Sequence, residues 1–339
     1  MPWMTVDDFL EAHSKWVQRG RGFVWSKLHP SRRARTRSAF DQTAAQAANW
    51  WIIPRVRKRW NNLITGSPEQ TYEEMLMSAY FKGRQGLRML SLGSGAATHE
   101  WALAAAPALV HIDCVDLSAE MLHSAAARVQ QENPQRARKM AFHVKDIADF
   151  DFPDEAYDVV LFHSSLHHFR HVDQLLEATI ARTLRPKGLL IVNEYVGPNR
   201  LQYPTHQLQA VEEALHTIPP AYRTRYMTGL LKTRVRGPGR LRMILADPSE
   251  CVDSEAIVPT LHRHFDTIYE RAYGGNLLMP VLKDIAHHFV SPDADREAVL
   301  EKLFDMEDDY LKRHPSDFLF GIYGHRNQHD EAGSSSPMT

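Results

Sequence analysis

A pair of glycines between an apolar run and an alanine-rich stretch marks the part of the sequence best suited to hold a ligand. Gly93 and Gly95 follow the apolar run 87–92, and the helix-forming stretch Thr98–Ala106 begins just after them. A glycine turn lets a ligand approach the backbone, and the first turn of the next helix offers N–H groups without intrahelical partners. Asp116 ends the following β-branched run, about 20 residues on, where an acidic side chain can accept from ribose hydroxyls. The spacing predicts a site for a cofactor that contains a nucleoside.

The elements that must position this turn alternate between strands and helices. Short apolar runs are predicted as strands, and Ser118–Gln130 and Val172–Leu184 are predicted as helices between them. The run 157–162 is apolar throughout, which is typical of a parallel strand covered on both faces. The order predicts an α/β fold with a doubly wound, mostly parallel sheet of seven strands. The predicted strands are Leu87–Leu92, Val110–Val115, Met140–Val144, Tyr157–Phe162, Leu189–Glu194, Phe265–Arg271 and Asp317–Tyr323.

Helical segments are expected before the first strand and after the fifth. Three helices should precede the sheet, and Pro54 should end or kink the second of them. They are expected at 5–19, at 40–64 and from a cap at Ser67 to Tyr80. The stretch 196–260 is expected to lie over the carboxyl ends of the strands, where open α/β sheets bind ligands. The predicted parts are an N-terminal helical lid (1–82), a Rossmann-like core (83–195), a helical insertion or cap (196–260), the C-terminal part of the core sheet (261–325) and a disordered tail (326–339).

The composition argues against several classes of protein. The 339 residues carry a net charge of −1, with 43% hydrophobic and 24% charged residues, so we expect a globular chain without the overall charge that attracts nucleic acid or an anionic membrane. Two cysteines, Cys114 and Cys251, are too few for a disulfide framework or a cysteine-based zinc site. No signal-peptide pattern or membrane-spanning run is found. We expect a cytoplasmic protein and make no prediction of its oligomeric state.

One segment departs from this neutral balance. Residues 15–37 contain eight Lys or Arg and no acidic residue, interleaved with Trp16, Phe23 and Trp25. Such a pattern can bind RNA or phosphate. It is also typical of a solvated surface segment whose aromatic side chains pack inward, and no known nucleic-acid module accompanies it. Nucleic acid is therefore not expected as a partner.

The glycine turn also distinguishes between kinds of cofactor. A dinucleotide fingerprint needs a third glycine or alanine at the position of Thr98. The spacing instead resembles motif I of the class I S-adenosylmethionine (SAM) dependent methyltransferases, Gly-x-Gly-x-Gly, in which Gly93 and Gly95 match and Ala97 replaces the third glycine. Ser91 stands where many members carry an acidic residue that helps to hold the methionine part of SAM. The resemblance implies a Rossmann-like methyltransferase fold with SAM as cosubstrate or substrate.

Later motifs extend the resemblance over about residues 66–195 and, more loosely, 264–324. YDVVLFHSSLHHF and LRPKGLLIVNEY resemble the family's fourth-strand and fifth-strand motifs, and HFDTIYERAYGG and DFLFGIYG resemble its closing antiparallel pair. By this resemblance Asp116 binds the ribose, Asp146 takes the adenine amino group and Ile147 is its apolar neighbour. The predicted cofactor-binding residues are Gly93, Ser94, Gly95, Asp116, Leu117, Met121, Asp146, Ile147, His163 and Tyr72.

Histidines after the fourth predicted strand are the candidates for acid–base chemistry. Methyl transfer from a sulfonium is a direct displacement, so a base is needed only where the acceptor must lose a proton. His163, His167, His168 and His171 cluster here, and either His163 or His168 is the predicted base. Pairs of these histidines also have helical spacings that would suit a metal. The resemblance already accounts for a Leu-His-His-Phe sequence, so no metal is expected.

Polar residues end the fifth predicted strand and complete the list of candidates. Strand alternation puts Asn193 and Tyr195 on one face and Glu194 on the other. We expect Asn193 and Tyr195 to point into the site, where Tyr195 would hold a substrate amine or cation. The predicted catalytic residues are therefore His163, His168, Asn193 and Tyr195.

Several functions are compatible with these features. The leading prediction is methyl transfer to a small-molecule acceptor of natural-product biosynthesis. An alternative is an enzyme that cyclises SAM itself to azetidine-2-carboxylate and methylthioadenosine, which a pocket closed by Trp50, Trp51 and Trp60 would favour. A further alternative is an RNA methyltransferase that uses segment 15–37. The departures at Ser91 and Ala97 would favour a SAM-binding protein without enzymatic activity.

Overall fold

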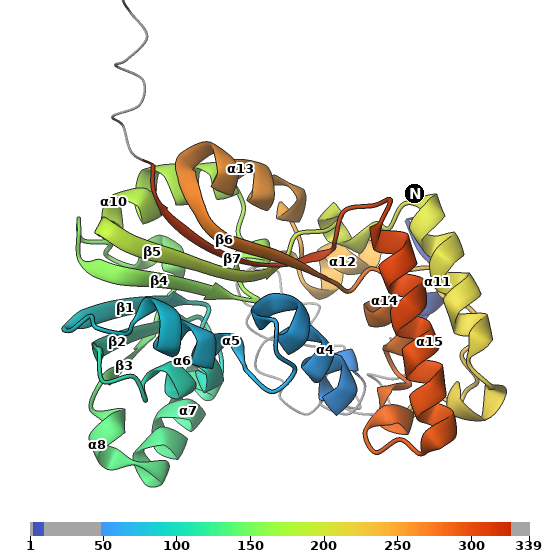
Figure 1. Ribbon diagram of the computed structural model, residues 1–339. Helices are drawn as coiled ribbons and strands as arrows, with labels where there is room; N and C mark the ends of the chain where they lie inside the picture. The colour runs from blue at the N-terminus through green and yellow to red at the C-terminus, as the bar shows by residue number, and fades with distance from the viewer. Residues whose placement is uncertain (1–2, 10–48, 327–339) are drawn as a thin grey trace, which may run out of the picture.

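A seven-stranded sheet runs through the molecule (Figure 1). Its strand order is β3-β2-β1-β4-β5-β7-β6. The first five strands are parallel, whereas β7 runs antiparallel to both β5 and β6. The predicted doubly wound, mostly parallel seven-stranded sheet is thereby confirmed. The strands are β1 (Leu87–Leu92), β2 (Leu109–Asp116), β3 (Met140–Val144), β4 (Tyr157–His163), β5 (Leu184–Tyr195), β6 (Phe265–Gly274) and β7 (Phe318–His325).

This computed structural model describes residues 3–9 and 49–326. The basic segment 15–37, most of the first predicted helix, the start of the second and the predicted tail from 327 onward lie outside the described residues. None of the helices in the described ranges is long and apolar enough to span a membrane.

Helices cover both faces of the sheet (Figure 1). The apolar core therefore consists of two layers, one on each face of the sheet. The apolar side chains of alternate strand residues make this division, because Met89 and Leu161 pack with one layer and Leu90 and Val160 with the other. The first layer contains α4 (Pro54–Thr65), α5 (Tyr72–Met75), η3 (Leu76–Tyr80), α6 (Thr98–Leu103), α7 (Ala119–Glu132) and α8 (Pro134–Ala137). The second contains α9 (Val172–Gln174), η6 (Leu175–Ile180), α10 (Ala181–Thr183) and α13 (Ile257–His264).

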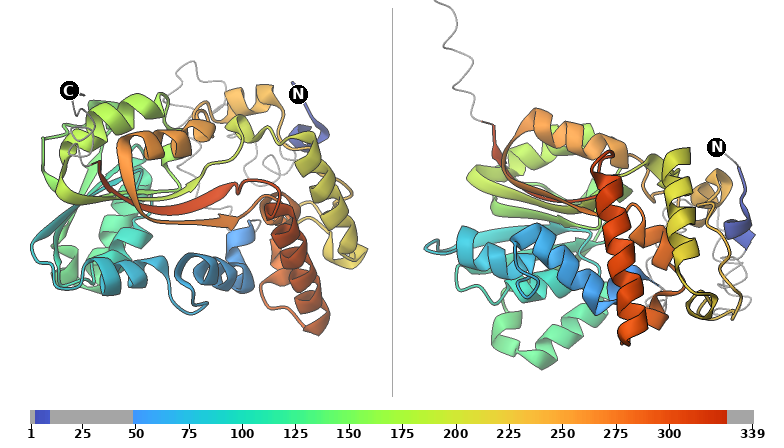
Figure 2. Two further views of the ribbon diagram at one scale, coloured as in Figure 1. Left: turned by 45° about the horizontal axis from the view of Figure 1, so that its top comes forward. Right: turned by 45° about the vertical axis from the view of Figure 1, so that its right-hand side comes forward.

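A third group of helices stands beside the sheet, at the right of Figure 1. Its apolar core joins Trp50 and Val56 to side chains from the segment after β5 and from the segment between β6 and β7. The helical insertion predicted after the fifth strand is therefore present, and the C-terminal helices pack against it. The group includes η2 (Trp50–Ile52), α11 (Thr205–Thr217), η8 (Pro220–Tyr222), α12 (Arg240–Ala246), α14 (Leu278–Leu282), η10 (Ala286–Phe289) and α15 (Ala294–Leu311); Figure 2 shows it from two further sides.

The structure confirms one prediction about the N-terminal helices and contradicts another. Pro54 is the first residue of α4, so the predicted break at Pro54 is confirmed. The predicted cap at Ser67 is wrong. The helix begins after Thr71, whose side chain accepts from the backbone N–H of Glu74, while the Glu74 carboxylate accepts from the N–H of Thr71. This reciprocal capping box satisfies two backbone donors at once, which outweighs a proline in the preceding turn.

Candidate active site

A cavity of about 750 Å³ opens at the carboxyl ends of β1, β2 and β4. These strands flank the point where the strand order reverses, which is where open α/β sheets bind ligands. Its size lies within the roughly 300–1,000 Å³ of sites for small molecules and cofactors. The predicted site residues that line it are Gly93, Ser94, Gly95, Asp116, Leu117, Met121, Asp146, Ile147, His163 and His168.

The glycine turn has the backbone shape that its sequence suggests. Gly93 and Gly95 have φ angles of +74° and +51°, in the left-handed region that favours glycine. A Cβ on Gly93 would lie 2.5 Å from the Cβ of Ser165, so the loop after β4 needs a glycine here. The Ser165 hydroxyl donates to the carbonyl of Leu92 at 2.6 Å and ties this loop to the end of β1. Ala97 also has a positive φ of 50°, which is the shape that a glycine adopts without strain.

Asp116 links the turn to the end of β2. Its carboxylate accepts from the N–H of Gly95 and from the N–H of Ser118, both at 2.8 Å. Burial raises the pKa of Asp116, and these N–H donors act in the opposite direction. A carboxylate has about four acceptor positions, so these N–H donors leave capacity to accept from a ribose hydroxyl. The geometry fits the role that the sequence assigned to Asp116.

The part of the cavity wall that follows β3 is built around Asp146. The Asp146 carboxylate accepts from the N–H of Ala148 and begins the short turn η4 (Ile147–Asp149). Phe150 and Phe152 follow it and line the same cavity. A carboxylate beside apolar and aromatic side chains suits an adenine ring with an exocyclic amine.

A buried carboxylate lies next to Ser91, where the family's motif I has its acidic residue. The Ser91 hydroxyl donates to Oε1 of Glu100 at 2.5 Å, and both side chains are buried. The second oxygen, Oε2, is buried without a hydrogen-bond partner among the described residues. Burial raises the pKa of Glu100. The sequence missed this pair, although Glu100 lies on the first helix after the turn, nine residues beyond Ser91.

His163 ends β4 in a stack of rings. Its ring lies 3.5 Å from that of His99, and its Nδ1 is 2.9 Å from the hydroxyl of Tyr72. Burial, reinforced by His99, holds the pKa of His163 well below its usual range, so the imidazole is neutral. Tyr72 was predicted to contact the cofactor directly. It does not line the cavity, and its ring stacks on that of His163, which does.

The prediction that Asn193 and Tyr195 point into the site is wrong for this cavity. Neither residue lines it. Asn193 accepts a hydrogen bond from the hydroxyl of Tyr273 at 2.7 Å, and the Tyr195 ring packs edge-on against Phe318. Both side chains are buried against β6 and β7, the antiparallel strands beside β5. Alternation correctly placed them on one face but could not tell which face borders the cavity.

Glu194, on the opposite face of β5, is the residue that organises the loop after β4. Its Oε1 accepts from the backbone N–H groups of Ser165 and Leu166, and its Oε2 lies 2.6 Å from Nδ1 of His167. Glu194 is fully buried. Burial alone would lower the pKa of His167, but this carboxylate raises it. An acidic residue inside the apolar run 189–195 was the only sequence signal for this role.

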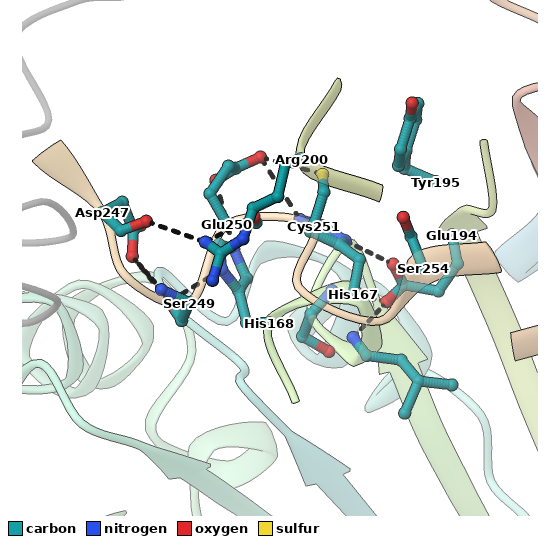
Figure 3. Close-up of polar contacts among 12 residues, drawn as sticks. His167, His168, Glu194, Tyr195, Arg200, Asp247, Ser249, Glu250, Cys251 and Ser254 are labelled. Carbon is teal, nitrogen blue, oxygen red and sulfur yellow. Dashed lines mark hydrogen bonds and ion pairs between the residues drawn. The ribbon is translucent and has the colours of Figure 1, made fainter. Parts of the chain in front are cut away.

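A loop from the helical insertion lines one side of the cavity, and Figure 3 shows its polar contacts. Pro248 and Ser249 line the cavity, and the Ser249 hydroxyl lies 3.1 Å from Nδ1 of His168. The Arg200 guanidinium donates to the carbonyls of Asp247, Pro248 and Glu250 and holds the loop in place. The sequence predicted a cap over this edge of the sheet but none of these residues, because their contacts span about fifty to eighty positions.

The other predicted features do not gather at the cavity. Trp50 packs edge-on against Trp60 in the helical group, at 4.6 Å between ring centroids, and Trp50 and Trp51 line a separate cavity of about 240 Å³. The four histidines after β4 do not share one helix, because only the short turn η5 (Leu166–His168) forms there. His171 has a left-handed backbone at the start of α9 and does not line the cavity.

Residues 90–190 match the family model described as a methyltransferase domain. Among curated proteins, the uncharacterized methyltransferase YcgJ of Bacillus subtilis (strain 168) is 27% identical over 131 residues, which cover 35% of this chain and 49% of YcgJ. The match thus spans about half the length of this relative.

Solved structures with low sequence identity are also similar to this chain. The [4+2]-cyclase SpnF is 16% identical with a TM-score of 0.45, covering 86% of this chain and 92% of SpnF. Phosphoethanolamine N-methyltransferase 2 of Haemonchus contortus, solved with S-adenosyl-L-methionine, is 16% identical with a TM-score of 0.46, covering 81% of this chain and 57% of its own.

The family-model match over residues 90–190 and the strand order around the glycine turn both indicate the same kind of domain. These residues form a methyltransferase domain of the class I SAM-dependent type, a class of transferases whose cosubstrate is SAM.

Proposed function

We propose that this chain is a SAM-dependent methyltransferase that methylates a small-molecule acceptor. The observation that carries the proposal is that one cavity brings the glycine turn, Asp116 and Asp146 together with His163 at the end of β4 and His168 in the loop after it. The glycine turn, Asp116 and Asp146 would hold the adenosine part of the cosubstrate. The two histidines would lie near its reactive methyl group and the acceptor.

The residues of the cavity divide into those that hold the cosubstrate and those that face the acceptor. Asp116 accepts from the ribose hydroxyls and Asp146 from the adenine amine, while Gly93 and Gly95 leave room for the ligand along the backbone. The Glu100 carboxyl group lies behind Ser91 near the end of β1, where the cationic methionine part would lie. That cation would favour the charged carboxylate against the burial that raises the pKa of Glu100. We propose that this carboxylate replaces the acidic residue that motif I lacks here.

His163 and His168 are the groups that can accept a proton from the acceptor. Burial lowers the pKa of both, with His99 acting on His163 and His167 acting on His168 in the same direction. A neutral imidazole at neutral pH can act as a base when the acceptor is a hydroxyl or an ammonium that must lose a proton. Because both line the cavity, either can reach a bound acceptor without a change of fold.

A small acceptor, rather than a polymer, fits the surroundings of the cavity. Its lining beyond the cofactor residues is mostly apolar and includes Phe169, Leu175 and Thr179, with Arg170 at its side. Loop 247–250 closes over it. We propose an acceptor of the natural-product kind, with an apolar body and one nucleophilic group, and a cytoplasmic location for the reaction.

The test is to incubate the purified chain with methyl-labelled SAM, first alone and then with a panel of small hydroxyl and amine acceptors. Calorimetry first measures whether SAM binds. Labelled product together with S-adenosylhomocysteine, formed only when an acceptor is present, is the expected result. Methylthioadenosine formed without an acceptor would replace this proposal by self-cyclisation of SAM. Labelling of RNA but of no small molecule would favour the RNA methyltransferase, and absence of SAM binding would refute the proposal altogether.

A further inference from the structure

Three possible metal ligands converge beside the cofactor cavity, on the side closed by loop 247–250 (Figure 3). His167 and His168 follow β4, and Glu250 comes from the helical insertion. The ligating atoms of the three side chains all lie within 4.8 Å of one another. Nε2 of His167 is 3.9 Å from Oε1 of Glu250, and Nε2 of His168 is 3.8 Å from Oε2 of the same carboxylate.

These separations are too long for hydrogen bonds and close to those of atoms that share an ion. A hydrogen bond between an imidazole nitrogen and a carboxylate oxygen would bring them within about 3.2 Å. Zinc lies about 2.0–2.2 Å from nitrogen and oxygen ligands, so two ligands of a tetrahedral ion are roughly 3.3–3.6 Å apart. A side-chain shift on the order of half an ångström would bring each of the two pairs, His167 with Glu250 and His168 with Glu250, to this spacing.

Hydrogen bonds on the far side of each ring orient the two Nε2 atoms. Nδ1–H of His167 donates to the buried carboxylate of Glu194, so its Nε2 carries the lone pair when the ring is neutral. The Ser249 hydroxyl donates to Asp247 at 2.6 Å, which leaves its oxygen to accept from Nδ1–H of His168. Carboxylate or hydroxyl partners of this kind are typical behind histidine metal ligands, because they fix the tautomer and the ring orientation.

Glu250 is also held in place before any ion binds. The Arg200 guanidinium donates to the carbonyls of Asp247, Pro248 and Glu250. The backbone N–H of Arg200 donates to the carbonyl of Cys251 at 2.6 Å. The N–H of Val252 donates to the carbonyl of His167 at 3.1 Å, so the two ligand-bearing segments are joined directly. The Cys251 thiol lies 3.3 Å from Oε1 of Glu250. A site fixed in this way loses little entropy when it takes up a ligand.

We propose that His167, His168 and Glu250 bind a divalent transition-metal ion, with Zn²⁺ as the ion that this ligand set suits best. Two imidazole nitrogens and one carboxylate form a three-ligand site that leaves at least one coordination position for water or for an oxygen of a bound molecule. His168 also lines the cavity, so the ion lies at the cavity wall. No metal was expected from the sequence, because the family resemblance accounts for the Leu-His-His-Phe sequence and the third ligand, Glu250, lies 82 residues beyond His168.

The test uses the metal alone and does not depend on the proposed methyl transfer. The full chain is stripped with a chelator and titrated with Zn²⁺ by calorimetry, and then with Co²⁺ while its visible absorption is recorded. We expect one site per chain and the absorption bands of a cobalt ion with nitrogen and oxygen ligands. Glu250→Gln keeps the shape of the side chain and removes its charge, so Zn²⁺ affinity should fall at least tenfold. SAM binding is measured on the same samples, which separates failure of this site from failure of the proposed function.

Matched variants separate loss of a ligand from loss of structure. His168→Asn and His167→Asn each keep an amide near the position of Nδ1 and remove Nε2, so each should weaken Zn²⁺ at least tenfold with an unchanged circular dichroism spectrum. Glu255→Gln makes the same chemical change as Glu250→Gln at an exposed position five residues on and should leave Zn²⁺ affinity unchanged. Glu177→Gln tests the other group with ligand spacing in the described chain, Asp173, Glu177 and His264. Absence of stoichiometric binding, full affinity in Glu250→Gln, or loss only in Glu177→Gln would overturn the proposal.

Discussion

The two sides of the cavity are built in different ways. The side formed by β1, β2 and β3 consists of short-range features, because Gly93, Gly95 and Asp116 lie within one strand–helix–strand unit. The Asp116 carboxylate accepts from the backbone N–H groups of Gly95 and Ser118. The side formed by β4, β5 and loop 247–250 depends on side chains that are far apart in the sequence, such as Glu194 with His167 and Ser249 with His168. The first side therefore follows from local spacing in the sequence, and the second from the packing of distant segments.

This difference has an energetic counterpart. Backbone turns hold the first side, so a substitution there acts through steric overlap and strained dihedral angles. Buried charges hold the second side, so a substitution there acts through unpaired groups and depends on pH. The two sides meet where the Cβ of Ser165 approaches Gly93.

The largest effect is expected where the two sides touch. Gly93→Ala places a Cβ 2.5 Å from the Cβ of Ser165, and it puts a side chain on a residue with a positive φ. The variant should lower the free energy of unfolding by about 2–4 kcal/mol. It should also abolish SAM binding, because the glycine turn lines the cavity. Urea unfolding and calorimetry measure the two effects. Gly86→Ala is the matched control, because Gly86 has a similar φ of +69° with no atom within 4 Å, and it should cost only about 1 kcal/mol. Equal effects of the two variants would show that the two sides are not in tight contact.

A smaller, pH-dependent effect is expected from Glu194→Gln on the second side. The Glu194 carboxylate raises the pKa of His167, so the charged pair stabilises the fold fully below about pH 6.5 and loses this contribution as the pH rises through the raised value. The variant should therefore lose about 2 kcal/mol at about pH 6 and distinctly less at about pH 9. Urea unfolding at both pH values measures it.

His167→Asn provides the control for the pH effect, because it removes the titrating ring. In that background the cost of Glu194→Gln should no longer depend on pH, as a double-mutant cycle would show. A cost that is the same at both pH values in the native background would contradict the assignment of the pair.

Asp116→Ala should act on the cosubstrate. It removes the acceptor that we assign to the ribose, and it should weaken SAM by more than about 1 kcal/mol, or roughly fivefold, in calorimetry. Asp151→Ala, at an exposed position outside the cavity lining, is the control and should leave the affinity unchanged. Unchanged affinity in Asp116→Ala would refute the ribose assignment.

The smallest effect is expected at Ala97, on the first side. Ala97→Gly relieves the strain of the positive φ of 50°, which stabilises the fold. It also removes a buried methyl group and increases the conformational entropy of the unfolded chain, and both effects destabilise the fold. Because these effects oppose each other, the free energy of unfolding should change by no more than about 0.5 kcal/mol. Ala102→Gly makes the same change inside helix α6, where alanine has ordinary helical geometry, and should cost about 1 kcal/mol. A larger loss in Ala97→Gly than in Ala102→Gly would show that the methyl group, not the backbone, determines this position.

The sequence by itself determined the sheet, the glycine turn and the positions of Asp116 and Asp146. Each of these follows from spacing within one strand–helix unit, and local spacing survives folding because the backbone geometry of strands and helices is regular. Nine of the ten predicted cofactor residues line the cavity, namely all except Tyr72. The glycine turn follows from local spacing, whereas the role of Asp146 came from the family resemblance.

Only the tertiary structure decided which side chains complete the site. Strand alternation showed that Asn193 and Tyr195 share a face, but the packing of β6 and β7 decided that this face is buried away from the cavity. It equally decided that Glu194 holds the loop after β4 and that Glu250 meets His167 and His168. Such contacts join segments up to 83 positions apart, and their formation depends on how whole elements pack, which no local period of the sequence encodes.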